Sequence, residues 1–338
     1  SLSTDFVGTT DSVDLEFRTN NIVRTRITQK GQIEIFNTGQ SVFIGQNAGS
    51  NDDLNNRQNV FVGQNAGLNN TSGYWNIALG FESLFTNSTG VANIAIGYQA
   101  LYTNNGDQNT AVGQEALSAN ATGGQNSAFG AAALTSNTTG SSNVAVGLNT
   151  LHLNQDGSGN TAIGYTSLIN NISGSQNTAV GYASLEKNEA NNNTVLGSNA
   201  GLNNITGSGN LFLGSEAGAN ELGSNHLFID NSNTNTPLIW GDFDLNLLHF
   251  NGTVNISGAY TLPNVVGANN QVLTTDAVGN VTWQGPAVAL TSKWIGTGVT
   301  TLATITDKVG IGVLTPAAKL EVVSSSTASS TQDGILNI

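Results

Sequence analysis

A pentapeptide of the form Asn-x-Ala-Val-Gly recurs about every 17 residues through more than half of the 338-residue chain. Its closing glycines are Gly45, Gly63, Gly80, Gly97, Gly113, Gly130, Gly147, Gly164, Gly181, Gly197 and Gly214, separated by 16 to 18 residues. A degenerate twelfth copy spans 226–230. A fixed short period of this kind is typical of a solenoid, in which each unit packs only against its neighbours. We therefore predict an all-β parallel solenoid.

Residue size alternates within the pentapeptide. The second and fourth positions of a strand point one way and the third points the other. The fourth position is bulky and apolar in every copy, and we expect its side chains to form the coil interior: Val112, Phe129, Val146, Ile163 and Val180 in the central copies. The third position is Ala in seven central copies but Phe43, Phe61, Val195 and Phe212 towards the ends. A small residue held in register implies a second backbone close by, either in another chain or in a slim single-chain roll.

Asparagines recur at two fixed places in the repeat. The leading Asn predicts a hydrogen-bonded ladder at the strand spacing of ~4.8 Å, with members Asn76, Asn93, Asn109, Asn126, Asn143, Asn160, Asn177 and Asn193. Eleven residues further on, a second column includes Asn70, Asn87, Asn104, Asn120, Asn137, Asn154, Asn171, Asn188 and Asn204. Because Asn tolerates the left-handed αL conformation, we expect this column to mark a second corner of the coil. Ala-Leu pairs such as Ala100-Leu101 predict a second apolar column, and the closing Gly predicts positive φ at the first corner.

Composition excludes several classes of function. A net charge of −13 and a pI near 4.3 argue against nucleic acid as a partner, because phosphate binding requires clustered Lys and Arg. No apolar run approaches the ~20 residues that span a bilayer, so we expect no membrane insertion. The chain has no Cys, which excludes disulfides and thiolate sites, and its lack of Met suggests a processed or excised fragment.

Candidate catalytic and metal-binding residues are scattered. The three histidines fall in different segments (His152, His226, His249), and nothing in their spacing brings them together. Acids near the end of the repeats (Asp230, Asp242, Asp244) could bind Ca²⁺, but turn formation is the favoured interpretation. A sugar-cleaving enzyme would need two acids on adjacent coils, and the available ones (Glu82, Glu115, Glu186, Glu189) form no column. We expect no catalytic residue, cofactor or metal.

Aromatic residues at the corners of the repeat offer the one binding hypothesis. Tyr98, Tyr102, Tyr165 and Tyr182 could stack on sugar rings. The alternative is that these rings pack on neighbouring coils or between subunits.

The pentapeptide resembles a signature of a known family. Thr178-Ala179-Val180-Gly181 and Ile94-Ala95-Ile96-Gly97 are similar to the Ser-Val-Ala-Ile-Gly motif in the heads of trimeric autotransporter adhesins. The resemblance covers residues 41 to about 230. It implies three chains, each wound as a left-handed parallel β-roll and packed around a common axis.

The flanking segments contain Gly31-Gln32-Ile33-Glu34-Ile35 before the repeats, and Tyr260-Thr261-Leu262-Pro263 and Val309-Gly310-Ile311-Gly312 after them. These segments resemble modules of tail-fibre-like proteins from bacteriophages, contractile injection systems and the surface fibres of Bacteroidota-type bacteria. They give five predicted domains: an N-terminal β module (1–40), the β-roll of about 11–12 coils (41–230), a β cap (231–258), C-terminal β fibre modules (259–323) and a Ser/Thr-rich linker or start of a next module (324–338).

We expect a structural fibre segment that presents surfaces to a cell-surface glycan or protein receptor and joins other fibre or baseplate proteins. It would be extracellular, on a virion tail, an injection-system particle or a cell-surface appendage. The alternatives are a bacterial trimeric surface adhesin and, in another class, a β-helical carbohydrate-active enzyme.

Overall fold

The computed structural model describes residues 7–9, 11–256, 260–262, 267–268, 271–275, 281–284, 309–311 and 320–322. Strands, turns and irregular segments account for all of these residues, without a helix among them. The predicted all-β fold and parallel solenoid are confirmed.

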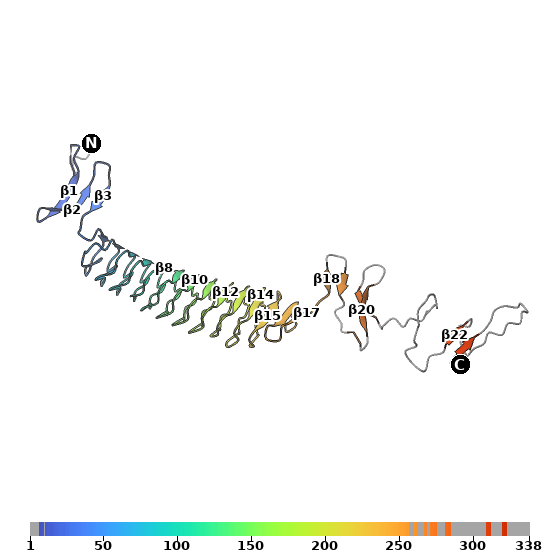
Figure 1. Cartoon of the computed structure of the whole chain (residues 1–338). Coiled ribbons are helices and arrows are strands. Elements are labelled where there is room, and N and C mark those ends of the chain that lie inside the picture. Colours follow the sequence, from blue (N-terminus) through green and yellow to red (C-terminus); the bar gives the residue numbers. More distant parts are fainter. Residues whose placement is uncertain are drawn as a thin grey trace, which may run out of the picture. The chain divides into compact units, whose positions relative to one another are not determined.

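Most of the described chain is wound into the row of stacked coils in Figure 1, whose strands form one parallel sheet. Its strands have three residues each: β4 (Val42–Ile44), β5 (Val60–Val62), β6 (Ile77–Leu79), β7 (Ile94–Ile96), β8 (Thr110–Val112), β9 (Ser127–Phe129), β10 (Val144–Val146), β11 (Thr161–Ile163), β12 (Thr178–Val180), β13 (Thr194–Leu196) and β14 (Leu211–Leu213). Each strand pairs in register with the next, as Ala145 pairs with Ala162. One repeat is therefore one coil.

The segment opposite the strands also stacks from coil to coil. The backbone N–H of Leu134 donates to the carbonyl of Thr150 at 3.0 Å, and Leu84 donates to Ala100 at 2.9 Å. These leucines have φ near +54°, in the αL region that costs a non-glycine residue roughly 1–2 kcal/mol. Full burial of a Leu side chain contributes about 1.5–3 kcal/mol, so packing together with the inter-coil hydrogen bond offsets the strain.

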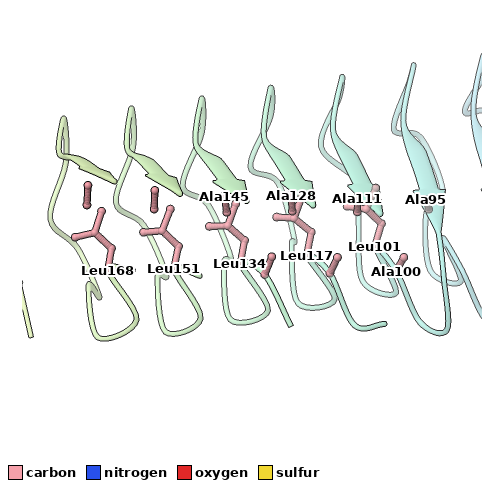
Figure 2. Close-up of a cluster of buried hydrophobic side chains, with 14 of the residues drawn as sticks. Ala95, Ala100, Leu101, Ala111, Leu117, Ala128, Leu134, Ala145, Leu151 and Leu168 are labelled. Atoms are coloured by element: carbon pink, nitrogen blue, oxygen red, sulfur yellow. The ribbon is translucent and has the colours of Figure 1, made fainter. Parts of the chain in front are cut away.

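The coil interior is built from small residues on the strands and leucines opposite them. Figure 2 shows the alanines of successive strands, among them Ala111 and Ala128, above a column that includes Leu117 and Leu134. All of these side chains are fully buried. The predicted second apolar column of Ala-Leu pairs is therefore confirmed, and the expected positive φ of the closing glycines is found, as at Gly147 (φ 137°).

The side chains predicted to fill the interior lie outside it, and that prediction is wrong. Phe129, Val146 and Ile163 are 43%, 37% and 40% exposed, and Val112 and Val180 are half-buried. The strand alternation was correct, but its two faces were assigned the wrong way round. A coil of about 17 residues is narrow, and leucine and asparagine side chains already occupy it, so a methyl group is what fits beneath the strand. The close second backbone implied by the alanines is the far side of the same coil.

In three coils a phenylalanine enters the interior where the opposite leucine is replaced by glycine. A Cβ placed on Gly67 would lie 2.5 Å from the ring of Phe61, and one on Gly218 would lie 2.8 Å from the ring of Phe212. The same pairing occurs between Phe43 and Gly49. The interior volume is therefore conserved along the solenoid by exchanging Ala plus Leu for Phe plus Gly.

Strands of other geometry flank the solenoid. Before it, β1 (Leu15–Thr19), β2 (Ile22–Ile27) and β3 (Ile33–Ile35) form an antiparallel sheet. After it, β15 (His226–Ile229) continues the parallel sheet, and β16 (Ile239–Asp242) and β17 (Leu247–Phe250) add to it as antiparallel strands. This change of direction ends the stack.

Beyond the solenoid sheet, the structure describes three strand pairs: β18 (Val254–Ile256) with β19 (Tyr260–Leu262), β20 (Val272–Thr275) with β21 (Val281–Gln284), and β22 (Val309–Ile311) with β23 (Leu320–Val322). The rest of the predicted modules after residue 258, including the whole segment 324–338, lies outside the described residues.

Candidate functional site

The first asparagine column is buried and bonds from coil to coil. The Oδ1 of Asn143 accepts the backbone N–H of Asn160 at 2.9 Å, and its Nδ2 donates to the carbonyl of Gly157 at 2.8 Å. The same bond, from a backbone N–H to the side-chain oxygen of the preceding coil, occurs along the column from Asn59 to Asn210, whose Oδ1 accepts the N–H of His226. The amides thus form a ladder, linked mainly from side chain to main chain of the next coil.

The second column is a ladder of side chains. The Nδ2 of Asn137 donates to the Oδ1 of Asn120 at 2.7 Å and to the carbonyl of Gly140 at 2.9 Å. Neither asparagine has positive φ, so the αL role expected for this column is wrong. Both columns satisfy buried polar groups within the coil, which makes them scaffold.

A carboxylate ends the second column at its N-terminal side and also bonds the first column. The Oδ2 of Asp52 accepts the Nδ2 groups of Asn59 and Asn70 at 3.0 and 2.8 Å. The adjacent Asp53 pairs with Arg57, whose guanidinium holds the pKa of that carboxyl well below its usual range. The acids here complete the ladder and the turn that begins it.

The outer face of the strands carries a continuous line of apolar side chains. Fourth-position residues are exposed or half-buried along the solenoid, and the exposed ones include Ile44 (52%), Leu79 (46%) and Leu196 (53%). Second-position residues add Val60, Ile77 and Val144 at 37–40% exposed. The stack of strands repeats this surface every ~4.8 Å.

The tyrosines proposed for sugar contact do not form one platform. Tyr165 and Tyr182 stack on each other with ring centroids 5.5 Å apart, whereas Tyr98 stacks on Phe81 at 5.6 Å. Tyr102 stacks on Phe85 in a different column, at 5.0 Å. One face of each ring is therefore covered by a neighbouring ring, as the alternative interpretation of packing between coils expects.

The acids considered for Ca²⁺ make local hydrogen bonds. One oxygen of Asp242 accepts the N–H groups of Asp244 and Leu245, which closes the turn between β16 and β17. Ser232 Oγ and the N–H of Leu238 donate to Asp230 and lower its pKa. Across the described ranges, no group of three or more His, Cys, Asp or Glu is arranged to hold a metal ion.

Two of the three histidines do come together, contrary to expectation. Trp240 of β16 lies between His226 of β15 and His249 of β17, with ring centroids 5.8 and 5.7 Å away. The antiparallel pairing of three consecutive strands produces this cluster, because Phe228, Trp240 and His249 are cross-strand neighbours. The close spacing of β16 and β17 along the chain was the available sequence signal, whereas the longer connection from β15 to β16 (230–238) gave none.

A cavity of about 340 Å³ lies beside this cluster, lined by Gly218, Asn220, Glu221, His226, Phe228, Asn233, Thr234, Asn235 and Trp240. The Nδ1 of His226 lies 3.2 Å from Glu221 Oε1, and this buried nitrogen has no well-aligned hydrogen bond. Asn220 Nδ2 donates to Asn233 Oδ1 at 3.2 Å and so holds the loop after β15 against the preceding coil.

These features define the class of the protein as a parallel β-solenoid repeat protein with an apolar outer face and a capped C-terminal end. Comparison with family models, with curated proteins and with solved structures finds no match. In the part of the chain that the structure describes, no helix has the length and apolar character to cross a membrane.

Proposed function

We propose that the chain is a rigid segment of an extracellular fibre, assembled from three identical chains that meet through the outer face of the strands. The observation that carries this proposal is the apolar line from Ile44 to Leu196. Soluble monomers rarely expose a contiguous apolar surface larger than a few hundred Å². Ten strands at ~4.8 Å extend this one over roughly 43 Å.

A second copy of the same chain is the partner that matches this surface best. Its apolar side chains repeat with the same spacing, so each ridge of one solenoid can fit beside the ridges of another along the full length. A globular partner would match only a few coils. The number three and the left-handed winding come from the resemblance to trimeric autotransporter heads.

The fibre role follows from the mechanics of the fold. Each coil is bonded to the next through strands, opposite segments and two asparagine columns, which favours a stiff rod. Three identical faces would convert weak receptor contacts into avidity. We place this segment in a tail fibre of a phage or injection system, joined to other fibre or baseplate proteins, with a cell-surface glycan or protein as receptor. A bacterial trimeric surface adhesin is the second candidate, favoured by the pentapeptide itself.

The test is to place charge on the proposed contact face. Val144→Lys with Val146→Lys adds two charges where both side chains are 37% exposed, and we expect dissociation to single chains in size-exclusion chromatography with light scattering. The matched control is Leu153→Lys, which changes a side chain that is 38% exposed and lies outside the strands. Equal masses for the double variant and the unmodified chain would refute the proposed face.

A further inference from the structure

The repeat changes its chemistry at the coil that ends the solenoid. One repeat after Asn204 the second column carries Glu221, and one repeat after Asn210 the first column carries His226. In the two 16-residue coils the equivalent pair is two asparagines, with Asn109 Nδ2 donating to Asn104 Oδ1 at 3.3 Å, and Asn193 to Asn188 at 2.9 Å. An ionisable acid and an imidazole thus replace a neutral amide pair.

The backbone hydrogen bonds at the end of the two columns do not by themselves require this replacement. Glu221 keeps the acceptor role of the amide, because Gly223 N–H donates to its Oε1 at 2.6 Å. His226 keeps the backbone bond, since its N–H donates to Asn210 Oδ1 at 2.9 Å. What the substitution adds is a carboxylate–imidazole pair, with His226 Nδ1 3.2 Å from Glu221 Oε1, and both residues line the 340 Å³ cavity.

We propose that this cavity binds a neutral saccharide, as a single ring or the end of a longer glycan. Its wall combines the indole of Trp240, which offers an apolar ring, with the carboxylate of Glu221, the imidazole of His226 and the amides of Asn220 and Asn235. An aromatic surface with a few convergent donors and acceptors is how small polar ligands are held. The chain carries a net charge of −13, which disfavours an anionic ligand.

The cavity is separate from the proposed contact face. His226 and Phe228 continue the inward columns of the coil, because Phe228 is in register with Phe212 of the strand before it. The contact face is formed by the opposite side of the strands. A trimer would therefore leave the cavity accessible. The choice of a saccharide rests on the proposed attachment role, although the geometry of the cavity does not.

The test uses the full chain and four probes: glucose, galactose, mannose and N-acetylglucosamine. Saturation-transfer NMR and the indole N–H resonance of Trp240, assigned with Trp240→Phe, would report binding. We expect at least one probe to bind saturably. Glu221→Asn with His226→Asn restores the amide pair found in two other coils, so the cap should fold, and binding should weaken at least tenfold.

The matched control is Tyr182→Ser, which removes an exposed aromatic in a column that elsewhere carries Ser198 and Ser215. It should leave binding unchanged. Absence of binding by all four probes, or unchanged affinity in the double asparagine variant, would overturn the saccharide cavity. A trimer that binds no sugar would overturn this inference alone, whereas a single chain that binds sugar would overturn the proposed assembly and leave the cavity standing.

Discussion

Exchange of Phe61 and Gly67 for the residues of the neighbouring coil tests the packing of the interior. In that neighbour, Ala78 and Leu84 occupy the equivalent positions. A Cβ at Gly67 would lie 2.5–2.7 Å from three ring carbons of Phe61, so Gly67→Leu alone should overpack the coil by about 3 kcal/mol. Phe61→Ala alone leaves a void and should cost about 3–5 kcal/mol.

The double variant should recover most of this loss. Its backbone is already suitable, because φ is 58° at Gly67 and 54° at Leu84. Two terms remain: the stack of Phe61 on Phe43, at 5.2 Å and worth ~0.5–1.5 kcal/mol, and about 1 kcal/mol for Leu in the αL region. We therefore expect the free energy of unfolding of the double variant to be about 2 kcal/mol lower than that of the unmodified chain. The losses of the two single variants would add up to about 6–8 kcal/mol.

Thermal unfolding followed by circular dichroism at one protein concentration measures this coupling. A domain of this size shifts by roughly 2–4 °C per kcal/mol, so the two single variants should melt well below the double variant. The pair Phe212 and Gly218, at the other end of the solenoid, should behave in the same way. A double variant as unstable as the sum of its parts would refute volume exchange between strand and opposite segment.

Three further predictions concern the columns and corners. Asn143→Ala removes an acceptor for one buried N–H and a donor to one buried carbonyl, and should lower stability by roughly 2–4 kcal/mol in denaturant titration, whereas exposed Asn51→Ala should change it by less than about 0.5. Gly147→Ala would place a Cβ 2.6 Å from the carbonyl oxygen of the next corner glycine, at φ 137°, and should lower the melting temperature or abolish folding; unchanged melting would show that the corners are looser than described. Asp53 has a folded pKa depressed by Arg57, so the stability it contributes is present above its unfolded pKa of about 4 and lost as pH falls through the folded pKa. The melting difference between the chain and Asp53→Asn should therefore shrink on acidification below about pH 4, and a difference that stays constant to pH 2 would count against the ion pair.

The period of the sequence predicted the solenoid because a repeat of about 17 residues leaves one coil as the simplest unit. The same pattern could not say which side of a three-residue strand faces inward. Bulky Val146 and small Ala145 suggest opposite answers, and the choice depends on the width of the coil. Leu151 and the asparagine columns set that width from the other sides of the coil, and their positions in space follow only from the fold. Hydrophobicity alone favoured the wrong face.

The C-terminal cap illustrates the same limit. The strands from 226 to 250 could be expected, but the meeting of His226, Trp240 and His249 depends on their antiparallel register. The sequence alone shows that Glu221 replaces asparagine in the second column, and this replacement was the available signal for a different kind of coil. Its consequence, a carboxylate–imidazole pair that lines a cavity, depends on the fold.

The solution mass of the unmodified chain tests the central claim most directly. Sedimentation velocity at micromolar concentration should give a single elongated species of about three times the 34.8 kDa of one chain. A species of 34.8 kDa would contradict assembly through the outer strand face, because the apolar line from Ile44 to Leu196 would then be a surface that the single chain leaves in water.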